Sequence, residues 1–181
     1  MKKIALVCAL CAFSGFAGAF AQTRGSVDIS FSYARQQGPG SNQFAVWVED
    51  AEGRYIKTLY ATRFTARGGW ERRPESIRQW VKKSALSSLS ASEVDAFTSA
   101  TPREGAQRFR WDGTDSRGKA VPAGNYVIYI EGSLRGESRV VYSALLRLGE
   151  ASGDVEVKAQ YHGSAGSERG MLTDVKVKAS T

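Results

Sequence analysis

Apolar and polar residues alternate along most of the chain. Between residues 27 and 33 the apolar side chains occupy every second position, and Val27, Ile29 and Phe31 are separated by Asp28 and Ser30. Successive side chains of a β-strand point to opposite faces, so this spacing predicts a strand with one buried face. The same period recurs over 44–48, 55–61, 108–111, 126–130, 140–148, 155–161 and 173–177. Short strands joined by Gly-containing turns predict an all-β fold, an antiparallel β-sandwich.

One segment, residues 65–103, breaks this alternation. Pro74 is favoured in the first turn of a helix, and Trp80 lies within an apolar spacing typical of one. Further along, Ser90 and Glu93 have the spacing of a capping box, which predicts a second short helical turn. We therefore predict a helical and loop insertion at the surface, where a rigid sandwich usually carries its specificity.

The first 21 residues have the parts of a secretory signal. Lys2 and Lys3 form a basic start, residues 4–20 carry no charge, and an A-x-A cleavage site ends at Ala21. We predict that 1–21 is a cleaved signal peptide and that 22–181 forms a single β-sandwich domain. No second apolar span follows, so we expect no membrane span after cleavage. The predicted location is the periplasm, with secretion to the medium as the alternative.

Cleavage changes the chemistry that the chain can offer. Cys8 and Cys11 leave with the signal peptide, so the mature domain has no cysteine, and its single histidine is His162. A Cys/His catalytic pair and a metal site then lack their usual residues, and we predict neither catalytic residues nor a metal. Loss of the two leader lysines leaves 23 basic and 18 acidic residues, a net charge of +5. In an exported protein this charge predicts an anionic ligand or an acidic partner rather than nucleic acid.

Two hairpin motifs point to a known architecture. Residues 46–59 read VWVEDAEGRYIKTL, and residues 111–126 read WDGTDSRGKAVPAGNY. Gly residues supply turn geometry in both, and we expect Trp111 and Tyr126 to pack in the core. Together the motifs are similar to those of the Ig-like domain of the flagellar hook-cap scaffolding protein. The resemblance implies an Ig-like or fibronectin-like sandwich and a structural role in an assembly.

A longer series of motifs covers nearly all of the mature chain. NQFAVWVED at 42–50, GGWERRP at 68–74, WVKKS at 80–84, the segment 95–102 and the hairpin at 111–126 occur in this order. The series resembles the predicted periplasmic domain-of-unknown-function family 2271. This resemblance implies export, a β-sandwich, and association with periplasmic iron-uptake and membrane flavin-reductase systems, with no catalytic residues assigned.

Basic and aromatic residues gather in the insertion: Arg67, Trp70, Arg72, Arg73 and Trp80. Guanidinium groups bind carboxylate or phosphate through forked hydrogen bonds, and indole rings offer a flat face for stacking. We predict that these residues form a docking surface for an anionic ligand or an acidic protein. The alternative is a solvated helix face in which the two tryptophans anchor the insertion to the sandwich.

A second candidate site follows the helical part of the insertion. Asp95, Thr98 and Thr101 resemble, position by position, the D-x-x-[ST]-G-A-T sequence to which a flavin transferase joins FMN through its phosphate. The resemblance implies covalent FMN on Thr101. Ser99 stands where the motif has Gly, which permits backbone torsions that Ser resists. The alternative is a capped loop that leads into the next strand.

The sequence leaves three functions open. The favoured interpretation is a non-enzymatic periplasmic binding or adaptor module, accessory to a membrane flavin reductase or an iron-uptake system, with a periplasmic or membrane protein as partner. The second is an FMN-carrying periplasmic redox protein modified at Thr101. The third is a structural Ig-like component of an assembly. The oligomeric state is not set by the sequence.

Overall fold

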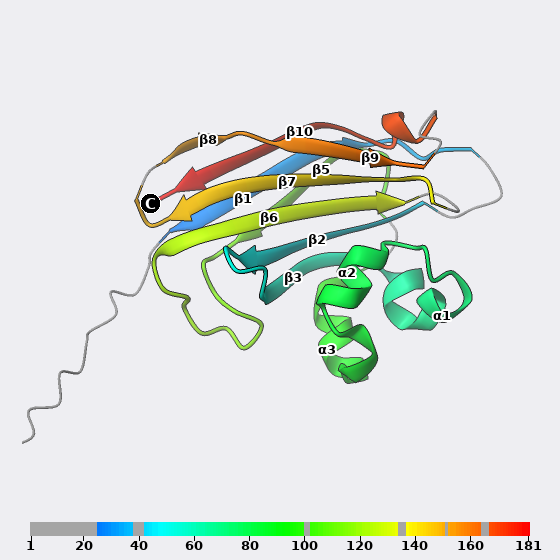
Figure 1. Cartoon of the computed structure of the whole chain (residues 1–181), viewed down its shortest axis with the longest axis horizontal. Helices are drawn as coiled ribbons and strands as arrows, with labels where there is room; N and C mark the ends of the chain where they lie inside the picture. Colours follow the sequence, from blue (N-terminus) through cyan, green and yellow to red (C-terminus); the bar gives the residue numbers. More distant parts are fainter. Residues whose placement is uncertain (1–24, 38–41, 100–101, 134–136, 151, 164–166) are drawn as a thin grey trace, which may run out of the picture.

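The chain folds as two β-sheets packed face to face, with short helices on the outer face of the larger sheet (Figure 1). The computed structural model describes residues 25–37, 42–99, 102–133, 137–150, 152–163 and 167–181. The predicted signal peptide and Thr101 therefore lie outside the described residues, and both stay predictions.

The strands divide into a smaller and a larger sheet. The smaller sheet has the order β5 (Gly105–Trp111), β1 (Ser26–Tyr33), β10 (Leu172–Ser180) and β8 (Gly153–Val155). The larger sheet has the order β4 (Thr98–Ser99), β3 (Tyr55–Thr62), β2 (Gln43–Asp50), β6 (Gly124–Ser133), β7 (Arg139–Leu148) and β9 (Lys158–His162). The first and last strands, β1 and β10, are direct neighbours. All pairs are antiparallel except the two-residue pair of β3 with β4, which confirms the predicted antiparallel sandwich.

Alternate side chains from both sheets form the principal core between them. Phe31 of the smaller sheet meets Phe44 of the larger sheet edge to face, with ring centroids 5.5 Å apart. Trp111 and Tyr126, at the two ends of the predicted hairpin, lie in this core with centroids 5.0 Å apart. Edge-to-face aromatic pairs of this kind stabilise a core beyond the area that they bury.

The prediction of one continuous strand over 155–161 is wrong. β8 ends at Val155 and pairs with β10, whereas β9 begins at Lys158 and pairs with β7. The chain passes from the smaller to the larger sheet between these two strands. Alternation continues through the crossing although the side chains from Lys158 to Tyr161 are all exposed or partly exposed, so the spacing alone does not mark where the chain changes sheet.

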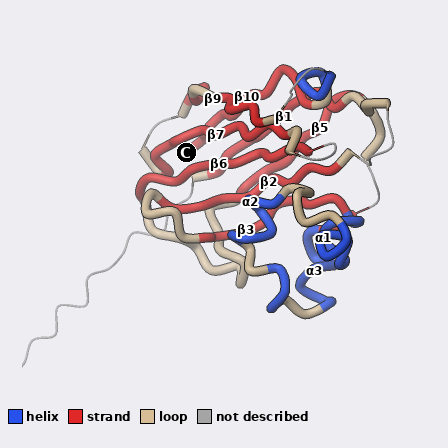
Figure 2. The backbone as a smooth tube through the Cα atoms, turned by 45° about the vertical axis from the view of Figure 1, so that its right-hand side comes forward, coloured by secondary structure: helices blue, strands red, loops and turns tan. Residues whose placement is uncertain are grey.

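The insertion folds as five short helical elements that lie beside β2 and β3 (Figure 2). They are η1 (Thr65–Gly69), α1 (Trp70–Arg72), α2 (Arg78–Lys83), η2 (Leu86–Ser88) and α3 (Ala91–Phe97). Apolar side chains of the insertion meet the outward side chains of β2 and β3 in a second core: Ala45, Trp47, Ala61, Ala66, Ile77, Trp80, Leu86 and Val94. All eight residues of β2 are therefore buried.

The helix bounds differ in part from the prediction. α2 begins at Arg78, not at Pro74, because Ile77 before it has a left-handed backbone with φ of 38°. The backbone N–H of Ile77 donates to Ser133 Oγ at 2.8 Å, which gives this group a partner outside the helix. The capping box of Ser90 and Glu93 is confirmed at the start of α3.

We expect replacement of Trp80 by Ala to detach the insertion while the sandwich stays folded. Trp80 is fully buried in the second core, and its indole N–H donates to Thr58 Oγ1 at 2.9 Å. Truncation of a buried Trp costs about 3–5 kcal/mol. Native-state hydrogen exchange should therefore show protection lost first over residues 65–97.

The matched control is Trp111→Ala, which removes the same side chain from the principal core. That variant should lower protection in both sheets. A uniform loss of protection in the Trp80 variant would contradict the separation of the two cores.

Candidate functional site

A buried carboxylate on the larger sheet holds the start of α2. Glu131 of β6 is fully buried and accepts hydrogen bonds from the backbone N–H groups of Gln79 at 3.3 Å and Trp80 at 2.9 Å. The first N–H groups of a helix have no partner within it, and a negative charge there is favourable. Arg139 Nη1 also donates to Glu131, at 3.1 Å. The carboxylate thus connects α2 to β6 and β7.

A second buried carboxylate holds the end of the same helix. Glu49 of β2 is 2% exposed and accepts from the indole N–H of Trp47 at 2.7 Å and from Lys83 Nζ at 2.8 Å. The Lys83 ammonium also donates to the carbonyl of Gly53 at 2.7 Å. Both ends of α2 are therefore fixed to the sheet by charged hydrogen bonds.

Burial also changes the proton affinity of the first carboxylate. Loss of solvent raises the pKa of Glu131 above its ordinary value, although the bonds from Trp80, Gln79 and Arg139 favour the charged form. The sequence analysis missed both carboxylates. Their outward positions on alternating strands are those of ordinary solvent-exposed residues, and no local signal sets them apart.

The predicted docking residues differ in exposure. Arg67 and Arg72 are exposed, and Trp70 and Arg73 are partly buried. Trp80 is fully buried, so its assignment to an exposed docking surface is wrong. Its indole ring lies on the face of α2 that packs against the sheet, and it anchors the insertion as the alternative interpretation held.

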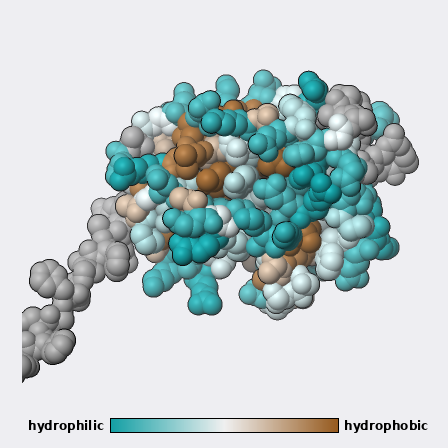
Figure 3. Space-filling model, viewed as in Figure 1, coloured by the Kyte–Doolittle hydropathy of each residue, from teal (hydrophilic) through white to brown (hydrophobic). Residues whose placement is uncertain are grey.

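Arg67 and Trp70 line an open groove of about 520 Å³ on the insertion. Arg67 also forms an ion pair with Asp95 of α3 across this groove region. Figure 3 shows apolar atoms at the surface of the insertion between hydrophilic ones. The apolar part of the groove lining comprises Ala66, Leu86, Leu89, Ala91 and Val94.

Two glycines shape the turn that presents the basic residues. Gly68 has a φ of +90°, which favours glycine, and a Cβ at Gly69 would overlap the carbonyl oxygen of Phe64. The guanidinium carbons of Arg72 and Arg73 lie 5.7 and 5.9 Å from the centre of the Phe64 ring. Two cations therefore share one aromatic ring at this turn.

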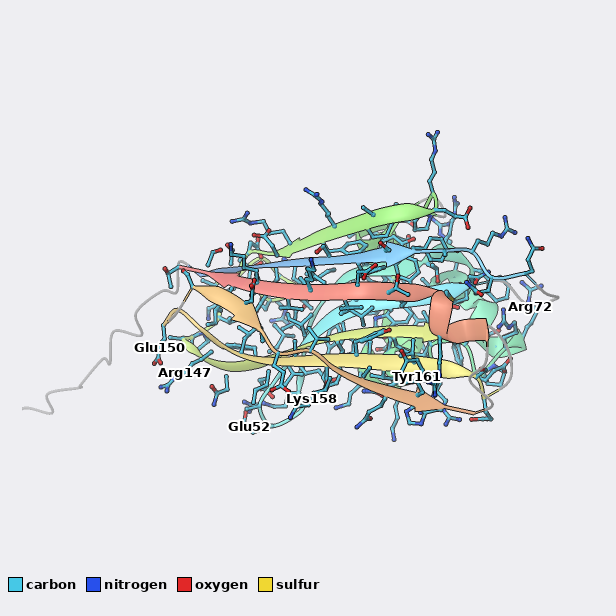
Figure 4. All side chains as sticks on the ribbon, turned by 90° about the horizontal axis from the view of Figure 1, so that it is seen from above. Glu52, Arg72, Arg147, Glu150, Lys158 and Tyr161 are labelled. Atoms are coloured by element: carbon cyan, nitrogen blue, oxygen red, sulfur yellow. The ribbon has the colours of Figure 1, made fainter. Side chains whose placement is uncertain are left out.

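Three exposed cations in or next to the insertion have no counter-charge among the described residues. Arg72 lies at the end of the molecule opposite Arg147 and Glu150 (Figure 4). Among the described residues, no ion pair or side-chain hydrogen bond is found for Arg72, nor for the exposed Arg63 and Lys82. We use the name docking surface for Arg67, Trp70, Arg72 and Arg73.

The structure describes two of the three residues of the predicted FMN site, Asp95 and Thr98. Asp95 pairs with Arg67, and Thr98 Oγ1 donates to the carbonyl of Val94 at 3.0 Å. Both side chains thus make contacts within the insertion at α3. Thr101 lies outside the described residues, so the attachment of FMN there stays a prediction.

Within the described ranges, no cluster of three or more His, Cys, Asp or Glu side chains is placed to hold a metal ion. Over the same ranges, no helix is long and apolar enough to cross a bilayer.

We expect the pH dependence of stability to differ between the wild type and Glu131→Gln. Because the pKa of Glu131 is raised on folding above its reference value of 4.5, its contribution to stability is largest below that value. This contribution is lost as the pH rises through the folded pKa. Gln keeps a carbonyl acceptor for Trp80 but does not titrate. The stability of the wild type relative to the variant should therefore fall with rising pH.

Urea unfolding of both proteins over a pH series measures this difference. Glu156→Gln makes the same replacement at an exposed position and serves as the control. A wild-type-to-variant difference for Glu131 that stays constant with pH would contradict the expected shift.

The chain matches a protein-family model over most of its length. Residues 25–164 match the family described as "Predicted periplasmic protein (DUF2271)". No curated protein and no solved structure matches the chain. The matched range runs from β1 to β9 and includes the whole insertion. This match confirms the family that the series of motifs resembles, and it confirms the predicted periplasmic location. The chain belongs to DUF2271, a family of predicted periplasmic proteins.

Proposed function

We propose that this periplasmic protein is a non-enzymatic binding module that docks an acidic protein through its insertion. The observation that carries the proposal is the exposed Arg72, which lies with the ion-paired Arg67 and Arg73 beside an open groove with apolar walls. No ion pair is found for Arg72 among the described residues, and its guanidinium lies over the ring of Phe64. Arg and Trp side chains are the residue types that most often dominate binding energy at protein interfaces.

Positive charge is concentrated between β3 and the end of α2. Residues 63–83 contain seven basic and two acidic residues. Four of the basic residues form ion pairs: Arg67 with Asp95, Arg73 with Glu75, Arg78 with Glu137 and Lys83 with Glu49. The charge that remains would attract an acidic surface and accelerate its association, most strongly at low salt.

The attachment of the insertion also supports a docking role. Glu131 and Glu49 fix the two ends of α2, and the second core packs the insertion against β2 and β3. A surface that is already ordered loses less conformational entropy when a partner binds. The groove beside Arg67 and Trp70 offers space for an apolar side chain of the partner.

The partner is a periplasmic protein or the periplasmic part of a membrane protein. The family resemblance favours a membrane flavin reductase or an iron-uptake component. No observation favours the FMN-carrying alternative, because Asp95 and Thr98 already bond within the insertion. None favours the structural alternative.

We expect the double variant Arg72→Glu/Arg73→Glu to lose partner binding. Two charge reversals beside an acidic surface should weaken affinity at least about tenfold, which corresponds to roughly 1.4 kcal/mol. Affinity capture from a periplasmic extract identifies the partner, and titration of the purified pair at two salt concentrations measures the change.

The matched control is Arg108→Glu/Arg110→Glu, which reverses two exposed arginines on β5 of the smaller sheet. The control should bind like the wild type. Unchanged binding by the Arg72/Arg73 variant, or an equal loss in the control, would rule out the insertion as the docking face.

A further inference from the structure

A small cavity lies where α3 packs on β3. Its volume is about 190 Å³, and its walls include Tyr55 and Thr58 of β3 together with Ala96 and Phe97 of α3. We call this space the β3–α3 cavity. Leu89 lines both this cavity and the groove of the docking surface, and the other lining residues of the two spaces differ. The cavity and the groove are therefore neighbouring spaces that share one wall residue.

The floor of the cavity holds more hydrogen-bond donors than acceptors. The indole N–H of Trp80 donates to Thr58 Oγ1 at 2.9 Å, and the hydroxyl oxygens of Thr58 and Tyr55 are 2.7 Å apart. If Thr58 donates to Tyr55, the hydroxyl hydrogen of Tyr55 is left over. If Tyr55 donates to Thr58, the hydroxyl hydrogen of Thr58 is left over.

One hydroxyl hydrogen thus lacks an acceptor among the described residues in either arrangement. Thr58 is buried and Tyr55 is half-buried, and both side chains line the cavity. The remaining hydroxyl hydrogen is therefore available to an acceptor atom of a molecule bound in the cavity.

The other walls are partly apolar and partly polar. Phe97 and Leu89 provide apolar surface, and Phe97 also meets Trp80 edge to face at 5.8 Å. The polar part of the lining comprises Lys57, Glu93 and Ser116. A cavity of about 150 Å³ with apolar walls is large enough for benzene. The β3–α3 cavity is therefore of a size for one aromatic ring with a small substituent.

We propose that the β3–α3 cavity binds a single-ring aromatic compound that places one hydrogen-bond acceptor on the Tyr55–Thr58 hydroxyl pair. The ring lies against Phe97 and Leu89, and the acceptor receives the surplus hydroxyl hydrogen. This site does not depend on the proposed docking of a protein partner.

Acetophenone and toluene are suitable probes, because both carry one ring and only acetophenone has an acceptor. The resonance of the Trp80 indole N–H, observed by NMR, reports binding because this group bonds directly to Thr58. We expect acetophenone to shift this resonance saturably, with a dissociation constant on the order of 1 mM or below. Toluene should bind at least about tenfold more weakly. An unshifted resonance, or equal affinity for the two probes, would overturn the proposal.

Two variants of α3 locate the binding. Ala96→Leu fills the cavity from an exposed helix position and should abolish the acetophenone shift. Ala91→Leu adds the same side chain on the groove face and should leave the shift unchanged. Both replace one strong helix former with another, so the fold is expected to persist. Binding of acetophenone to Ala96→Leu with wild-type affinity would exclude the cavity as its site.

Discussion

The burial of the Glu131 carboxylate under the first turn of α2 is the interaction on which the insertion depends. It supplies acceptors to the N–H groups of Gln79 and Trp80, which a helix cannot satisfy by itself. With α2 held in this position, Trp80 fills the second core and covers β2. The basic turn and the β3–α3 cavity both take their shape from this placement. A buried charge of this kind is costly, and its partners are what make it tolerable.

The sequence predicted the sandwich well because alternation directly reports a buried strand face. It predicted the capping box of α3 for a similar reason, since that motif is formed by neighbouring residues. It failed where the decisive contact is distant in the chain. Glu131 and Trp80 are 51 positions apart, and no local pattern marks either as a partner of the other. The basic residues of the insertion were found, but only the fold shows that Trp80 faces the sheet and Arg72 faces solvent.

The two sites proposed for this protein follow a common arrangement. The insertion uses one side to pack on the sheet, and the outward side carries the docking surface. The cavity lies between these layers and is lined by Tyr55 from β3 and Phe97 from α3. Small-molecule sites are typically concave and mostly apolar, with a few polar groups that fix the orientation of the ligand.

The pairing of β1 with β10 bears on when the protein can fold. Residues at the two ends of the described chain, such as Ser26 and Ser180, sit side by side in the smaller sheet. Because β1 pairs with the last strand of the described chain, this sheet cannot close until β10 has been synthesised. Such distant pairing slows folding in general. Slow closure of this sheet suits a periplasmic protein, because a chain that is still unfolded can cross a membrane before it folds.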